Sequence, residues 1–119
     1  MLNDATKNSF KKVYIASGRT DLRYGVTGLA TLVKCRYHLD PYDKGTLFLF
    51  CGRRSDRLKA LLWEGDGFLL MSKYLCDGRF QWPRDPAELK SLTYEQYRLL
   101  MEGFAIDRSI KEGQPKYLV

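Results

Sequence analysis

Short hydrophobic runs separated by turn-forming residues predict that this chain is built mainly from strands. Residues 13–16 are β-branched or aromatic and stop at Ser17-Gly18, which is typical of a strand entering a turn. A second run, residues 46–51, is rich in Leu and Phe and follows the turn signal of residues 40–45. We expect residues 46–51 to form a central strand with both faces at least partly covered.

The next runs predict antiparallel pairing. Residues 57–64 and 67–75 are separated by Gly65-Asp66, so we expect them to form a hairpin. Asp77-Gly78 then precedes the alternating segment 79–82, which Pro83 ends and which predicts a fifth strand. Together these runs predict an antiparallel meander of about five strands.

A first helix is expected between the first two strands. Its apolar face repeats at positions i, i+4, i+7 and i+11, which are Leu22, Val26, Leu29 and Val33. Thr20 or Asp21 could cap this helix. Because Gly25 and Gly28 form helix poorly, either the helix begins late or another backbone approaches it closely, and we favour close packing.

The C-terminal third predicts further helix. Asp85 and Pro86 suggest a short capped turn, and Thr93 with Gln96 forms a capping box. The apolar positions that follow share one helical face and are Tyr97, Leu100, Met101 and Phe104. Gly103 is a possible stop signal. We therefore predict a single α+β domain over residues 13–106 with both main helices on one face of the sheet, a flexible extension at residues 1–12 and a tail at residues 107–119.

Composition narrows the class of protein. The chain has 119 residues, 45% of them hydrophobic, which suits one domain, and its longest apolar run is far below the ~20 residues of a membrane span. The three cysteines show no C-x-x-C pair, so we expect reduced thiols and a cytoplasmic protein without disulfides. Cys51 is interpreted as a small buried hydrophobe rather than a zinc ligand. The carboxylates have local turn or cap roles, so we expect no catalytic residue, metal site or cofactor.

Basic residues are concentrated at one turn. The formal net charge is +6 and the isoelectric point is about 9.3, which favours a polyanionic partner such as nucleic acid. Arg53, Arg54, Arg57 and Lys59 lie close together against a single acid, Asp56. These four are the principal candidates for nucleic-acid contact. Two more residues, Arg23 and Arg79, are weaker candidates.

The hairpin register predicts which side chains share a face. With Gly65-Asp66 as the turn, Trp63 faces Phe68 and Arg57 faces Tyr74, while Lys59 faces Ser72. The other face is nearly all apolar and consists of Leu58, Ala60, Leu62, Leu69, Met71, Lys73 and Leu75.

A face with cations and aromatic rings could hold phosphates and stack bases. Alternatively, the C-terminal helix covers Trp63 and Phe68. Trp63, Phe68, Tyr74 and Trp82 are candidates for contact with a protein partner.

Four blocks in fixed order resemble one family over about residues 13–103. The blocks are Gly18-x-Thr20-Asp21-Leu22-Arg23-x-Gly25, Gly52-Arg53-Arg54-x-Asp56-Arg57-x-Lys59, Leu62-Trp63-x-Gly65-x-Gly67-Phe68 and Gly78-Arg79-Phe80-x-Trp82-Pro83. They resemble the accessory protein TnpB, the second-frame product of insertion sequence 66 elements. The resemblance implies a bacterial mobile-element protein that works beside a separate transposase and does not cut DNA.

Charge and resemblance together lead to one principal hypothesis. We expect a non-catalytic accessory protein of transposition that binds the DNA of the element ends, or the transposase–DNA complex, through the basic hairpin. A second hypothesis is an adaptor that docks on the transposase through Trp63, Phe68 and Trp82 without touching DNA. A metal-dependent nuclease that uses Asp21 or Asp56 ranks last.

Overall fold

The computed structural model describes residues 1–84 and 88–106. Its elements in chain order are β1 (Lys12–Ala16), α1 (Val26–Thr31), the π-helical turn η1 (Leu32–Arg36), β2 (Thr46–Cys51), β3 (Arg57–Trp63), β4 (Phe68–Tyr74), β5 (Leu89–Leu92) and α2 (Tyr94–Met101). This confirms the α+β class. Most of the capped turn expected at residues 85–88, and the tail 107–119, lie outside the described residues.

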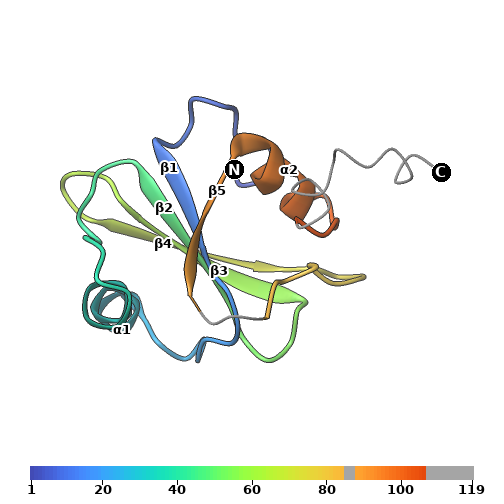
Figure 1. Cartoon of the computed structure of the whole chain (residues 1–119), viewed down its shortest axis with the longest axis horizontal. Helices are drawn as coiled ribbons and strands as arrows, with labels where there is room; N and C mark the ends of the chain where they lie inside the picture. Colours follow the sequence, from blue (N-terminus) through green and yellow to red (C-terminus); the bar gives the residue numbers. More distant parts are fainter. Residues whose placement is uncertain (85–87, 107–119) are drawn as a thin grey trace.

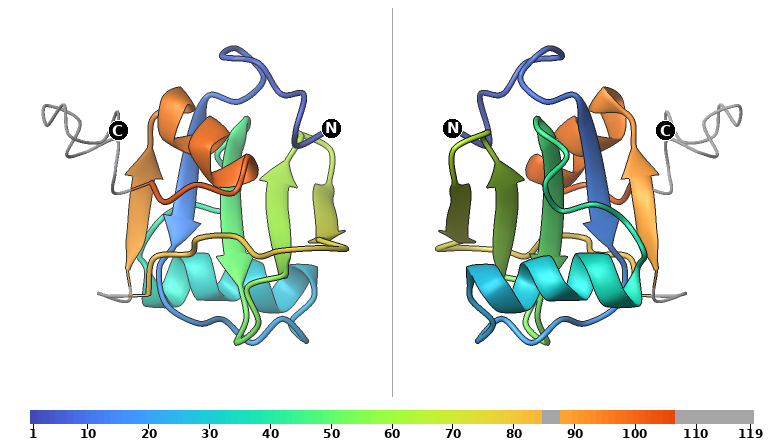
Figure 2. Two further views of the ribbon diagram at one scale, coloured as in Figure 1. Left: turned by 90° about the vertical axis from the view of Figure 1, so that its right-hand side faces the viewer. Right: turned by 90° about the vertical axis from the view of Figure 1, so that its left-hand side faces the viewer.

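The five strands form one sheet in the order β4-β3-β2-β1-β5 (Figures 1 and 2). Strands β2, β3 and β4 are an antiparallel meander, and the hairpin has the predicted register, with Trp63 opposite Phe68 and Arg57 opposite Tyr74. Strand β2 is central and buried along its whole length, as its composition predicts. The register of β3 and β4 could be predicted because the two-residue turn at Gly65-Asp66 determines which residues pair on either side of it.

The expectation of a wholly antiparallel meander is wrong at β1. Strand β1 pairs in parallel with β2, with Val13 opposite Leu47 and Ile15 opposite Leu49. Parallel neighbours require a long crossover connection, and the segment that contains α1 and η1 provides it. Strand β5 then pairs antiparallel with the outer edge of β1.

The fifth strand is β5 rather than residues 79–82. Segment 79–82 has no strand partner in the structure. Phe80 and Trp82 are instead 2% and 7% exposed and pack into the core. The backbone N–H of Phe80 donates to the carbonyl of Ser55 at 2.8 Å, and Trp82 Nε1 donates to the carbonyl of Ala16 at 2.9 Å. The alternation of polar and apolar residues over positions 79–82 therefore reflects two side chains that are buried in the core, not pairing in a sheet.

The two main helices lie on opposite faces of the sheet, not on one face as expected (Figure 1). On one face, Leu100 of α2 belongs to the same hydrophobic cluster as Leu47 and Leu49 of β2. On the other face, Leu29 of α1 belongs to the cluster of Phe48 and Phe50, also from β2. Because β2 carries large apolar side chains on both faces, each face requires its own cover.

The first helix begins late. It starts at Val26 with Gly25 at its N-cap, and no side chain caps it. Of the two expectations for this helix, the late start is therefore correct, and the favoured one, close approach of another backbone, is wrong. At Gly28 the close neighbour is a side chain, since an added β-carbon would lie 3.1 Å from Tyr24 Cβ. Asp21 bonds Arg23 instead of capping the helix.

The second helix agrees with its prediction. Thr93 Oγ1 accepts a hydrogen bond from the N–H of Gln96 at 3.1 Å, and the Gln96 side chain accepts one from the N–H of Thr93 at 2.9 Å. Gly103 follows the helix at a φ of +93°, a left-handed conformation that glycine adopts readily. The capping box and the stop signal are both confirmed.

The first residues pack on the sheet rather than extending from it. Leu2 is 6% exposed and belongs to the core, and its carbonyl accepts a hydrogen bond from Tyr97 Oη at 2.5 Å. An apolar residue near the chain start thus covers the α2 side of the sheet. In the part of the chain that the structure describes, no helix has the length and apolar character needed to cross a membrane.

Candidate nucleic-acid interface

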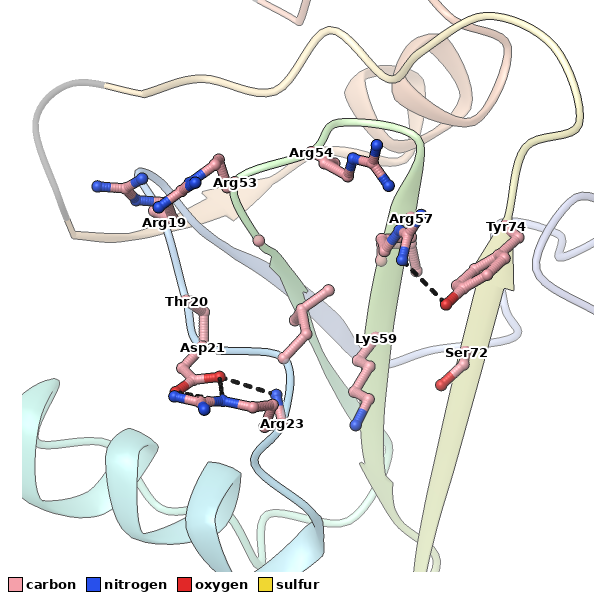
Figure 3. Close-up of a pocket in the computed structure, with 13 residues that line it drawn as sticks. Arg19, Thr20, Asp21, Arg23, Arg53, Arg54, Arg57, Lys59, Ser72 and Tyr74 are labelled. Atoms are coloured by element: carbon pink, nitrogen blue, oxygen red, sulfur yellow. Dashed lines mark hydrogen bonds and ion pairs between the residues drawn. The ribbon is translucent and has the colours of Figure 1, made fainter.

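A cationic cleft lies at the edge of the sheet where β1 and β2 end and β3 begins (Figure 3). Because β1 and β2 are parallel, the loops that follow them, residues 17–25 and 52–56, leave the sheet at the same edge. The cleft has a volume of about 920 Å³. Its cationic lining residues are Arg19, Arg23, Arg53, Arg54, Arg57 and Lys59, and the others are Thr20, Asp21, Leu22, Gly52, Leu58, Ser72 and Tyr74.

Close packing positions the two loops against each other. The backbone N–H of Thr20 donates to the carbonyl of Cys51 at 2.8 Å. A β-carbon at Gly52 would lie 3.2 Å from Leu22 Cγ and 3.5 Å from the Thr20 carbonyl oxygen. Glycine at position 52 therefore allows the two loops to approach this closely.

Arg84 forms hydrogen bonds with both loops, and no pattern in the sequence pointed to it. Its guanidinium donates to the carbonyl of Gly18 at 2.8 Å, to Ser55 Oγ at 2.9 Å and to the carbonyl of Arg53 at 3.4 Å. Bonds from a charged donor are stronger than those between neutral groups. Arg84 is thus a positioning residue for the loop that carries Arg53 and Arg54.

Three arginines of the cleft are exposed and form no ion pair in the described part of the chain. Arg19, Arg53 and Arg54 are exposed, and no carboxylate within residues 1–84 or 88–106 forms an ion pair with them. Arg53 and Arg54 occupy the loop between β2 and β3, where the sequence predicted a basic cluster. The structure places Arg19 beside them, because the parallel pairing of β1 brings its loop to the same edge.

Two other cations of the cleft are ion-paired. Arg23 bonds both carboxylate oxygens of Asp21, with the shortest contact at 2.7 Å, and Arg57 Nε lies 3.0 Å from Asp56 Oδ1. The hydrogen bond from Arg23 lowers the pKa of Asp21 to about 2, and that from Arg57 lowers the pKa of Asp56. Both carboxylates are therefore ionised at neutral pH and partly neutralise their arginines.

The hairpin supplies one wall of the cleft. Lys59 and Arg57 stand opposite Ser72 and Tyr74, as predicted. Lys59 Nζ donates to the carbonyl of Tyr24 at 3.0 Å. The Arg57 guanidinium carbon lies 4.3 Å from the centre of the Tyr74 ring, and its Nη1 donates to Tyr74 Oη at 3.0 Å.

The remaining candidates lie elsewhere. Arg79 is exposed but is not among the lining residues. Trp63 and Phe68 form an edge-to-face pair, with ring centres 4.9 Å apart, and Tyr42 packs on both. The cover is therefore Tyr42 and not the C-terminal helix. Since Trp82 is in the core and Tyr74 lines the cleft, the four aromatic candidates do not form one surface.

Cys51 is fully buried, as expected for a small hydrophobe, and burial raises the pKa of its thiol. Across the described ranges, no three His, Cys, Asp or Glu side chains gather in a group that could hold a metal ion.

The fold and the cleft define a small α+β protein with a recess that six arginine and lysine side chains help to line. Its sequence belongs to the IS66 Orf2-like family, whose model matches residues 11–111. This confirms the resemblance to the second-frame product of these insertion elements and associates the chain with an accessory role in transposition.

Two uncharacterized proteins of Sinorhizobium fredii (strain NBRC 101917 / NGR234) are similar to the chain. Protein y4jC is 34% identical over 92 residues, which cover 77% of this chain and 78% of that protein. Protein y4hO is 38% identical over 92 residues, covering 77% and 79%. No solved structure matches the chain.

Proposed function

We propose that this protein is a non-catalytic accessory factor that binds the DNA of its insertion element, or the transposase–DNA complex, through the cationic cleft. The observation that carries the proposal is the gathering of six cationic side chains around one recess, three of them exposed and in no ion pair among the described residues. Each phosphate that such a side chain neutralises releases condensed counterions, which drives binding.

The pairing of Asp21, which lines the cleft, and of Asp56, which lies beside the cleft in the loop 52–56, favours a binding role over catalysis. Metal-dependent phosphoryl transfer requires carboxylates directed at Mg²⁺ ions. Asp21 and Asp56 are instead engaged by Arg23 and Arg57.

A second candidate function is docking on the transposase without DNA contact. The supporting observation is the aromatic cluster of Tyr42, Trp63 and Phe68, because Tyr42 at its surface is 54% exposed. Exposed aromatic residues are enriched at protein interfaces. Co-purification with the transposase that survives high salt, together with flat DNA titrations, would favour this function.

The test is a DNA-binding series against salt concentration. Fluorescence anisotropy compares element-end duplex with unrelated duplex, for the parent, for the double variant Arg53→Gln/Arg54→Gln and for Lys34→Gln/Arg36→Gln. The last is a matched control, because it removes two exposed positive charges from η1 outside the cleft.

The parent affinity is expected to fall as salt rises. The slope of log K against log salt should become shallower by about 1.8 in the cleft variant, because each phosphate that is no longer neutralised reduces the slope by about 0.9. The control should keep the parent slope. Affinity that does not change with salt, or a cleft variant that binds like the parent, would refute the DNA role.

A further inference from the structure

Tyr74 is an exposed aromatic residue in the wall of the cleft that the six cationic side chains line. It is 68% exposed, the highest value among the large aromatic side chains in the part of the chain that the structure describes. Its neighbours in the recess include Arg57, Lys59 and Ser72 (Figure 3). So much exposure means that packing in the core does not account for the ring.

The ring is nevertheless held in place. The Arg57 guanidinium covers one face at 4.3 Å, Arg57 Nη1 donates to Tyr74 Oη, and Asp56 bonds Nε of the same arginine. This chain of contacts fixes the orientation of an aromatic plane at the wall of the cleft. Since most of the residue remains exposed, the face opposite Arg57, which is turned away from Arg54, is open to a flat ligand at the outer rim of the cleft (Figure 3).

The exposed ring of Tyr74 favours an unpaired strand over a duplex. A DNA duplex keeps the faces of its bases stacked on one another, so it offers the Tyr74 ring only groove edges and backbone. An unpaired strand can enter the recess, expose a base to the ring and place its phosphates on Arg53 and Arg54.

We infer that the cleft binds unpaired DNA in preference to duplex, with a base stacked on Tyr74 and the flanking phosphates on Arg53 and Arg54. This inference rests on the proposed function and specifies its ligand. Stacking on an aromatic ring tolerates any base, so the cleft selects strand structure rather than sequence. A transposition factor with this property would act where the ends of the element are opened or cut.

The test compares three labelled probes of equal length in anisotropy titrations. They are an oligodeoxythymidine, its duplex with oligodeoxyadenosine, and oligouridine. A length of about 12 nucleotides lies within the roughly 4–16 nucleotides that a single small OB-fold domain covers. The variants are Tyr74→Leu, Tyr74→Phe and Tyr42→Leu. Tyr42 is a matched control, because it is also an exposed tyrosine but lies outside the cleft.

The parent is expected to bind the single strand more tightly than the duplex. Tyr74→Leu should weaken single-strand binding by about 5- to 150-fold, the loss expected for one stacked base, and leave duplex binding nearly unchanged. Tyr74→Phe keeps the aromatic plane and should stay close to the parent, as should Tyr42→Leu.

Other outcomes overturn the inference in distinguishable ways. Duplex binding as tight as single-strand binding, or a Tyr74→Leu variant that binds the single strand like the parent, refutes it and leaves the proposed DNA role standing. Tighter binding of oligouridine would reassign the cleft to RNA. Absence of binding to both DNA probes refutes the inference, and it refutes the proposed function as well when the element-end duplex also fails to bind.

Discussion

Replacement of Arg84 by lysine separates the positioning of the cleft from its charge. Lysine keeps the positive charge but cannot reach three acceptors in the fixed geometry of a guanidinium. The two short bonds, 2.8 Å to the Gly18 carbonyl and 2.9 Å to Ser55 Oγ, should be absent from the variant. At the low end of the range for charged hydrogen bonds, this costs about 3 kcal/mol of unfolding free energy. For a chain of this size, the expected fall in Tm is about 10 °C.

Urea unfolding and the DNA salt series measure the two properties separately. Arg84→Lys should be less stable and bind DNA more weakly, because the Arg53-Arg54 loop loses its support, yet the salt slope should not change. Arg98→Lys is the control, since Arg98 forms only exposed ion pairs with Glu95 and Glu102 among the described residues, and such pairs contribute little. Parental stability would show that Arg84 does not hold the loop. A shallower salt slope would show that the variant has lost phosphate contacts, which would contradict a pure effect on positioning.

Three further outcomes test the fold. Leu100→Ala should lower the unfolding free energy in urea by about 2–5 kcal/mol, because the side chain is completely buried, and a decrease below about 1 kcal/mol would contradict its place in the core. Thr93→Ala should cost about 1 kcal/mol through removal of the capping box, and thermal unfolding that matches the parent would exclude that role. Burial raises the pKa of Tyr97 to about 12 from 10.0, so the neutral form stabilises the fold below pH 10, and this contribution disappears as pH rises toward 12. Unfolding measured across that range should show a steeper decline for the parent than for Tyr97→Phe, and equal declines would refute the assignment.

Features that depend on neighbours in the chain were predicted well. The hairpin register followed from the turn at Gly65-Asp66, and α2 followed from the capping box of Thr93 and Gln96. The burial of β2 followed from its unbroken apolar run. In each case the deciding contacts join residues close in sequence, so their chemical types are visible as a pattern.

The arrangement of distant segments was not visible in the same way. Parallel and antiparallel placement of β1 would satisfy the same run of apolar residues, and the choice rests on pairing with Leu47 and Leu49, more than thirty residues away. The strand expected at residues 79–82 failed for a related reason, because alternation cannot distinguish a paired strand from an extended segment that inserts two side chains into the core.

The same distinction between local and distant contacts applies to the candidate site. The positive charge of Arg53, Arg54, Arg57 and Lys59 could be located in the chain without coordinates, because it is a property of consecutive residues. Their assembly with Arg19 into a cleft required the parallel crossover of the folded chain. No sequence pattern could reveal that Arg84 supports the loop, because its acceptors are mainly backbone carbonyls. Every residue carries such a carbonyl, and only folding decides which of them lie within reach of the guanidinium.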